Sequence, residues 1–222
     1  MKKALKSAKL SSGHSSGNSG RKGPALRAAK EYGFIKGSYI KSWEYLKKSR
    51  NFIFIIVGIF FAFALAGFFI PAPQAVSDYL LKFIKELVGE TSGLPATGLI
   101  WFIFFNNIKT SFFGMALGVF FGIFSVFISL FNGYILGFVA AMSVKQDGVL
   151  ILWRLFPHGI FELPAVWISL GLGLKLGGSS LSKEKGRFRK DLLDSLRVFA
   201  FIVIPLLIIA AIIEGSLISI LG

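Results

Sequence analysis

Long apolar runs separated by short polar segments dominate the pattern of this chain. Residues 51–70 contain no charged side chain, come directly after Lys47-Lys48-Ser49-Arg50 and end at Pro71. A helix of about 20 residues extends roughly 30 Å, which is the thickness of the hydrocarbon core of a bilayer. The pattern therefore predicts a transmembrane helix over residues 51–70, and similar runs predict further spans over residues 97–113, 114–131, 160–176 and 198–221.

The segments outside these runs have other patterns. Residues 1–24 consist mainly of Ser, Gly and Lys, so we expect a disordered basic tail before a membrane domain over residues 25–222. Residues 25–50 and 74–90 place apolar side chains at helical spacing opposite charged ones, which predicts amphipathic surface helices. We expect the helix over residues 25–50 to lie in the lipid headgroup layer. Its pattern fits almost equally well a cytoplasmic helix that packs on the rest of the protein.

Polar positions interrupt the stretch over residues 133–157. The preceding run breaks at Asn132-Gly133, and the apolar pieces 134–144 and 149–156 are each too short to span a bilayer. We therefore expect a re-entrant or interfacial helical hairpin over residues 133–157. The predicted fold class is an all-α polytopic membrane protein with about five transmembrane helices, this hairpin and amphipathic surface helices.

Composition and charge support a membrane location. The chain of 222 residues is 54% hydrophobic, with a mean hydropathy of +0.70. Its net charge of +14 is concentrated beside the apolar runs: residues 1–50 hold 13 Lys and Arg against 2 acidic residues, and residues 175–197 hold 7 against 3. This placement favours cytoplasmic segments that contact anionic headgroups, and not nucleic acid. With five spans, we expect a cytoplasmic N-terminus and an extracytoplasmic C-terminus in the cell membrane.

Cysteine is absent from the chain, which excludes disulfides, thiol catalysis and thiolate metal sites. Glycines recur at intervals of four, a spacing that lets the backbones of two membrane helices approach closely. We expect these glycines to serve helix packing, within the chain or between copies in a homo-oligomer, and not to line a pore. They are Gly114, Gly118, Gly122, Gly133 and Gly137.

Arg154, His158 and Glu162 are charged or titratable residues in an otherwise apolar stretch. Such side chains are costly at membrane depth and usually face a protein interior or a watery cavity. Their spacing of four aligns them on one face of a helix, although Pro157 favours a new helix start and leaves His158 and Glu162 as the firmer pair. The other members that we assign to this intramembrane polar cluster are Asn106, Asn107, Asn132 and Glu214.

Three interpretations of the cluster compete. The favoured one is structural: Glu162 pairs with His158, Arg154 or Lys145, or accepts hydrogen bonds from freed backbone N–H groups, and fastens the hairpin to the following span. The second is a transport path, because carriers build their sites from broken helices and titratable residues at the midplane. The third, a metal-dependent hydrolase, has too few ligands for the three that a catalytic zinc requires. We therefore expect no catalytic residues, no metal, no cofactor and no enzyme activity.

Three segments carry a family likeness: NNIKTSFFGMALGVFFG at residues 106–122, LFNGYILGFVAA at 130–141 and LFPHGIFELPAVWISLGLG at 155–173. Together they resemble the stage II sporulation protein M family of integral membrane proteins, over roughly residues 40–222. The resemblance implies a membrane scaffold, which in spore-forming bacteria holds peptidoglycan-degrading partners during engulfment. We therefore expect a scaffold or membrane-organising protein that recruits partner proteins. The alternative is a transporter or channel-like protein with a midplane polar site around His158 and Glu162.

Overall fold

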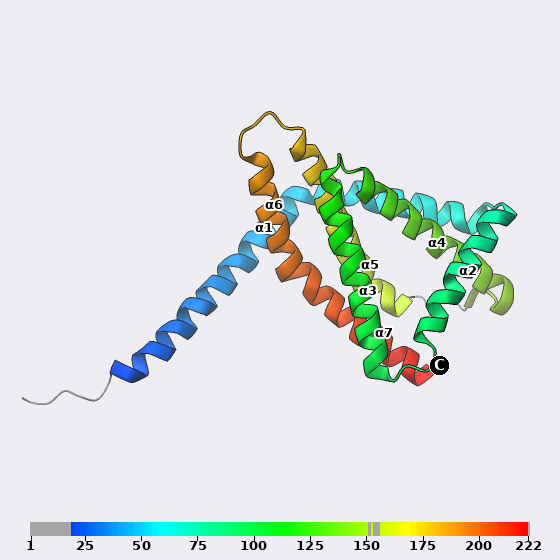
Figure 1. Cartoon of the computed structure of the whole chain (residues 1–222), viewed down its shortest axis with the longest axis horizontal. Coiled ribbons are helices and arrows are strands. Elements are labelled where there is room, and N and C mark those ends of the chain that lie inside the picture. Colours follow the sequence, from blue (N-terminus) through cyan, green and yellow to red (C-terminus); the bar gives the residue numbers. More distant parts are fainter. Residues whose placement is uncertain (1–18, 151, 153–155, 222) are drawn as a thin grey trace, which may run out of the picture. The chain divides into compact units, whose positions relative to one another are not determined.

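The computed structural model describes residues 19–150, 152 and 156–221, and every regular element within these ranges is a helix (Figure 1). The predicted all-α class is therefore confirmed. The chain divides into two compact units, Met1–Gly37 and Ser38–Gly222, and the division falls inside helix α1 (Ser19–Phe69).

The rest of the second unit follows α1 in a simple order. An amphipathic helix, α2 (Gln74–Thr91), precedes α3 (Ala96–Ala116), the 3-10 turn η1 (Leu117–Val119), α4 (Ile123–Asp147) and α5 (Phe156–Ser180). Helix α6 (Arg187–Val198) then continues through a π-helical turn, η3 (Phe199–Val203), into α7 (Ile204–Leu221). The π-helical turn ends two residues before Pro205, whose missing N–H favours a kink in this span.

Helix α1 corrects two predicted boundaries. The sequence predicts a disordered tail up to residue 24, but the helix already begins at Ser19; residues 1–18 lie outside the described part of the chain. The sequence also predicts separate elements on either side of residue 50, whereas α1 continues without a break to Phe69. Lys and Arg are good helix formers, so the change from basic to apolar residues at Lys47–Asn51 does not interrupt the backbone hydrogen bonds.

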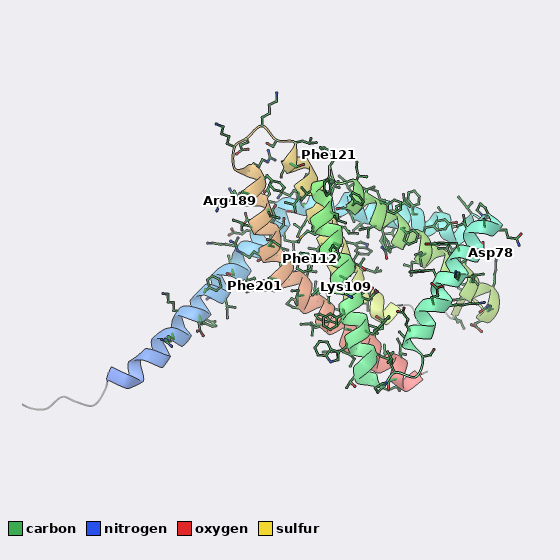
Figure 2. All side chains as sticks on the ribbon, viewed as in Figure 1. Asp78, Lys109, Phe112, Phe121, Arg189 and Phe201 are labelled. Carbon is green, nitrogen blue, oxygen red and sulfur yellow. The ribbon has the colours of Figure 1, made fainter. Side chains whose placement is uncertain are left out.

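The break between α3 and α4 lies later than the predicted boundary at residues 113 and 114. It is formed by Phe121 and Gly122, whose φ angles are 55° and 74°. Gly122 N donates to Gly118 O at 2.7 Å, which closes the turn. Figure 2 labels Phe121 at this position. The left-handed conformation suits glycine at 122, while Phe121 is held there at some conformational cost.

Helix α4 corrects the predicted hairpin over residues 133–157. The sequence predicts a break at Asn132-Gly133, but α4 is a single helix through Asp147 and ends at Gly148, which has a φ of 79°. The Asn132 side chain stays within this helix, because its Nδ2 donates to Ile128 O at 2.8 Å. Residues 133–147 are thus the second part of a long helix and not the limb of a hairpin.

Four of the described helices are long and apolar enough, by length and composition, to cross a membrane: Lys30–Phe69, Ile123–Asp147, Gly159–Ser180 and Arg187–Ile220. Helix α3, which the sequence predicts as a further span, is not among them because Asn106, Asn107 and Lys109 lower its hydropathy. Large apolar side chains such as Phe54, Phe127 and Ile212 remain exposed on these helices. Contiguous apolar surface of this kind suits contact with lipid.

Helices α3, α5 and α7 of the second unit pack against one another. Helix α4 runs beside the part of α1 that contains Phe60 and Ala64 (Figure 1). Phe112 of α3 meets Phe199 of η3 edge to face, with ring centroids 5.6 Å apart. The main buried cluster draws residues from α1, α3, α5, α6, η3 and α7: Tyr45, Met115, Ala165, Leu172, Leu176, Val198, Phe199, Ile202, Val203 and Leu207.

Several contacts bring together the C-terminal part of α5, the turn η1, the start of α6 and the middle of α1. Lys175 Nζ of α5 donates to Ser49 Oγ of α1 at 3.0 Å, and Ser180 Oγ of α5 donates to Val119 O of η1 at 3.1 Å. Asp191 of α6 lies at the same end. We call this the basic end of the second unit. Gly215 of α7 packs instead on Ile100 of α3, so the last helix ends away from the basic end.

Candidate functional site

The structure brings three of the predicted polar residues together between α3, α5 and α7. The Glu162 carboxyl of α5 hydrogen-bonds the side chain of Glu214 on α7 and the side chain of Asn107 on α3. All three residues are partly buried. A hydrogen bond between two carboxyl groups requires a proton on one of them, so this contact limits the negative charge that the cluster carries at membrane depth.

The partners of Glu162 differ from those that the sequence suggests. Arg154 lies outside the described residues, and of His158 only the backbone, in the first turn of α5, is described. The stripe of Arg154, His158 and Glu162 therefore stays a prediction. The start of α5 at Phe156, directly before Pro157, matches the preference of proline for the first turn of a helix.

Asn106 and Asn132 do not join Glu162. Both line a separate cavity between α2, α3 and α4. Asn106 is one residue from Asn107, yet successive helical residues point about 100° apart, so the two amides of the Asn-Asn pair serve different surroundings. Within the described residues, no three His, Asp or Glu side chains gather in an arrangement that could hold a metal ion.

The glycines lie where helix backbones meet. Gly118 faces α5 so closely that a Cβ there would come within 2.5 Å of the backbone of Gly173. Gly114 and Gly122 face Leu170 and Leu174 of the same helix. Gly133 and Gly137 instead face the backbone of α1, at Phe60 and Ala64. The two glycine groups thus face two different neighbours, and all five positions are internal to one copy of the chain.

Sequence reasoning missed a polar network at the basic end. Asp191 of α6 is buried and accepts a hydrogen bond from Tyr45 Oη at 3.0 Å and another from Ser179 Oγ. Lys175 Nζ lies 3.7 Å from the centroid of the Tyr45 ring. The network joins α1, α5 and α6. The sequence signals this network only by placing Asp191 within a basic segment, and that pattern does not reveal the partners of Asp191.

Tyr45 of this network belongs to a buried face of helix α1. Ser38, Ser42, Tyr45 and Ser49 are buried, and their spacing places them on one helical face. The opposite face carries exposed Tyr39, Ile40 and Trp43, which we call the exposed aromatic face. Within the second unit, residues 38–50 therefore pack on the rest of the protein and leave an aromatic surface uncovered.

Comparisons with known proteins agree with the membrane character of the chain. Residues 52–217 match the family described as stage II sporulation protein M. An uncharacterized protein of Methanocaldococcus jannaschii is 37% identical over 117 residues, which cover 49% of this chain and 65% of that protein. The aligned part thus spans just under two thirds of that relative's length. No solved structure matches. From the matched region and its apolar helices, the chain is a multi-pass membrane protein that belongs to the stage II sporulation protein M family.

Proposed function

We propose that this protein is a membrane scaffold that recruits a partner protein, and that it is not an enzyme. The observation that carries the proposal is the exposed aromatic face of Tyr39, Ile40 and Trp43, with exposed fractions of 54%, 49% and 49%. Aromatic residues are enriched where proteins bind one another. This face is presented on a helix whose other side is fixed to the membrane body by Tyr45 and Ser49.

The partner that fits this surface has a contacting segment with apolar and acidic side chains. Exposed Lys47 lies one helical turn after Trp43 on the exposed aromatic face, and Lys41 and Lys48 are exposed on the same segment of α1. Lys47 Nζ is 5.9 Å from the ring centroid of Trp43, which keeps a positive charge beside the aromatic surface. The same lysines attract anionic headgroups, so lipid is the competing occupant.

The orientation that we propose places the basic end in the cytoplasm. Residues 175–197 and residues 38–50 both lie at this end, and both have an excess of Lys and Arg, which favours the cytoplasmic side of the membrane. Since α7 ends away from the basic end, the C-terminus is then extracytoplasmic. The exposed aromatic face would thus meet its partner on the cytoplasmic side.

The proposal is tested by photo-crosslinking in native membranes. A photoreactive amino acid replaces Tyr39 in one variant and Phe54 in a control, because Phe54 is also exposed but lies in the uncharged apolar part of α1. We expect a discrete protein adduct at position 39 that position 54 does not give. If both positions yield lipid adducts alone, the exposed aromatic face is a lipid contact and the proposed recruitment is refuted.

A further inference from the structure

A cavity of about 560 Å³ lies between α2, α3 and α4 of the second unit. Its polar lining consists of Glu86 and Glu90 from α2, Asn106 and Thr110 from α3 and Asn132 from α4. Its apolar lining includes three phenylalanines, Phe83, Phe127 and Phe131. A volume of this size, with an apolar wall and a few convergent polar groups, is typical of sites for small organic molecules.

The polar lining offers mainly hydrogen-bond acceptors and negative charge. Ionised Glu86 and Glu90 only accept hydrogen bonds, and Asn132 Nδ2 is already engaged with Ile128 O at 2.8 Å. No Lys or Arg is among the described residues that line the cavity, although the chain has a net charge of +14. Local charge therefore favours a cation over an anion of the same size.

One neighbouring lysine does not change this balance. Lys82 Nζ lies 3.9 Å from Glu86 Oε1, and the two side chains are 78% and 64% exposed. An ion pair this exposed contributes little to stability, so a ligand cation can displace it. Lys82 does not line the cavity itself.

The apolar wall suits the body of such a cation. The rings of Phe127 and Phe131 stack with centroids 6.3 Å apart and planes inclined by 9°. Their parallel faces and the nearby Phe83 supply the aromatic surface on which organic cations are held by cation–π attraction. A ligand with a compact positive group and a hydrocarbon or aromatic body would match both parts of the lining.

We propose that this cavity binds a lipophilic organic cation, an ammonium group on an apolar body. The ammonium is either the headgroup of a membrane lipid or a free amphiphilic amine. The proposal does not depend on the scaffold function, because the cavity residues and the exposed aromatic face of α1 are different residues.

Binding of radiolabelled tetraphenylphosphonium to the full chain in a nonionic maltoside detergent tests the proposal, with tetraphenylborate as an anion of the same shape. The variants are Glu86→Gln and Glu90→Gln. The matched control is Asp78→Asn, which removes the same charge from an exposed position of α2 (Figure 2). Asp78 is not among the residues that line the cavity. All three substitutions are at exposed residues, so monodispersity by gel filtration checks that each variant is folded.

We expect tetraphenylphosphonium to bind more tightly than tetraphenylborate. Each cavity variant should raise the dissociation constant of the cation about fivefold, because the attraction between two opposite charges a few ångströms apart in water changes a binding constant by about that factor. Asp78→Asn should bind like the unmodified chain. Equal binding of the two probe ions, or equal binding by the cavity variants and the control, would overturn the proposal.

Competition then identifies the source of the ammonium. Displacement of the probe by short-chain phosphatidylethanolamine, but not by phosphatidylglycerol of the same chain length, assigns the site to a lipid headgroup. Displacement by decylamine without displacement by the lipid assigns it to a free amine. If neither compound displaces the probe, the ammonium assignment is refuted.

Discussion

At the scale of single residues, close helix packing depends on glycine at particular positions. A Cβ at Gly118 would lie 2.5 Å from backbone atoms of Gly173, which cannot move aside as a flexible side chain can. Gly58 on α1 has open space at its Cβ position. The two residues therefore form a matched pair in which one substitution collides with a neighbouring helix and the other does not.

We expect Gly118→Ala to lower the free energy of unfolding in detergent by about 1–3 kcal/mol, the usual cost of overpacking a close interface. Gly58→Ala should be neutral or stabilise by up to about 1 kcal/mol, because alanine favours a helix. Thermal melting of both variants measures the difference. Equal melting temperatures would show that η1 and α5 do not approach as closely as described.

The contact between Glu162 and Glu214 leads to a second prediction at this scale. A neutral glutamine donates and accepts hydrogen bonds as a protonated carboxyl does, so Glu162→Gln should keep most of the stability. Glu162→Ala leaves polar groups on α3 and α7 without this partner and should cost roughly 1–3 kcal/mol. The yield of monodisperse protein and its melting temperature compare the two variants. A glutamine variant as unstable as the alanine variant would contradict a hydrogen bond in which one of the two carboxyl groups is protonated.

The polar cluster shows what sequence reasoning can and cannot supply at the residue scale. Glu162, Glu214 and Asn107 stand out because polar residues are rare in apolar runs. Their mutual contact depends on how α3, α5 and α7 pack, which residue spacing along one chain segment does not encode. The partners of Asp191 escape sequence reasoning for the same reason: Tyr45 is 146 residues away, and Ser179, 12 residues away, lies on a different helix.

At the scale of elements, Asp191 connects α6 to α1 and α5. Its carboxylate accepts from Tyr45 and Ser179, and Arg187 Nε lies 3.8 Å away. Arg187 also pairs with Glu184 at 3.7 Å, but that carboxylate is 71% exposed. Glu184 is thus a matched control that removes an ion pair with the same arginine without disturbing the buried network.

We expect Asp191→Ala to destabilise the protein by about 2–3 kcal/mol, because two buried hydroxyl donors lose a charged acceptor. Glu184→Ala should change stability by less than about 0.5 kcal/mol, as exposed ion pairs usually do. Amide hydrogen exchange locates the effect: faster exchange should appear in residues 38–50 and 187–198 of the Asp191 variant alone. Unchanged exchange in both segments would show that Asp191 does not fasten α1 to α6.

At the scale of elements, the apolar pattern of the sequence predicts some helix boundaries and not others. The apolar runs at residues 51–70 and 198–221 end within one residue of the helix ends at Phe69 and Leu221. The break between α3 and α4 was misplaced because Phe121 and Gly122 adopt left-handed angles beside Gly177 of α5, a tertiary contact. The hairpin was overpredicted because Asn132 finds its hydrogen-bond partner inside α4.

At the scale of the whole molecule, the positions of the helix ends predict which loops share a side of the membrane. Ser180 is at the basic end, where its Oγ contacts Val119 O, while Ser92 follows α2 in the turn before α3. Single cysteines at these positions are the only thiols in their variants, because the chain has no cysteine.

We expect a membrane-impermeant maleimide to label Ser92→Cys in intact cells and to label Ser180→Cys only after the membrane is opened. Ser180 is exposed in the structure, so its thiol is accessible once the reagent reaches that side. Labelling of both thiols in intact cells, or of neither, would contradict the orientation and the path of the chain through α3, α4 and α5.

The measurement that tests the central claim most directly is quantitative recovery of the crosslinked partner with variants of the exposed aromatic face. Tyr39→Ala/Trp43→Ala removes two exposed aromatic side chains, and Phe54→Ala/Ile55→Ala removes two exposed apolar side chains from the uncharged part of the same helix. Loss of aromatic anchors typically costs about tenfold or more in binding. We predict at least a tenfold lower partner recovery for the first variant and unchanged recovery for the second, at equal amounts of folded protein. Equal recovery from both variants would contradict the scaffold function proposed for this surface.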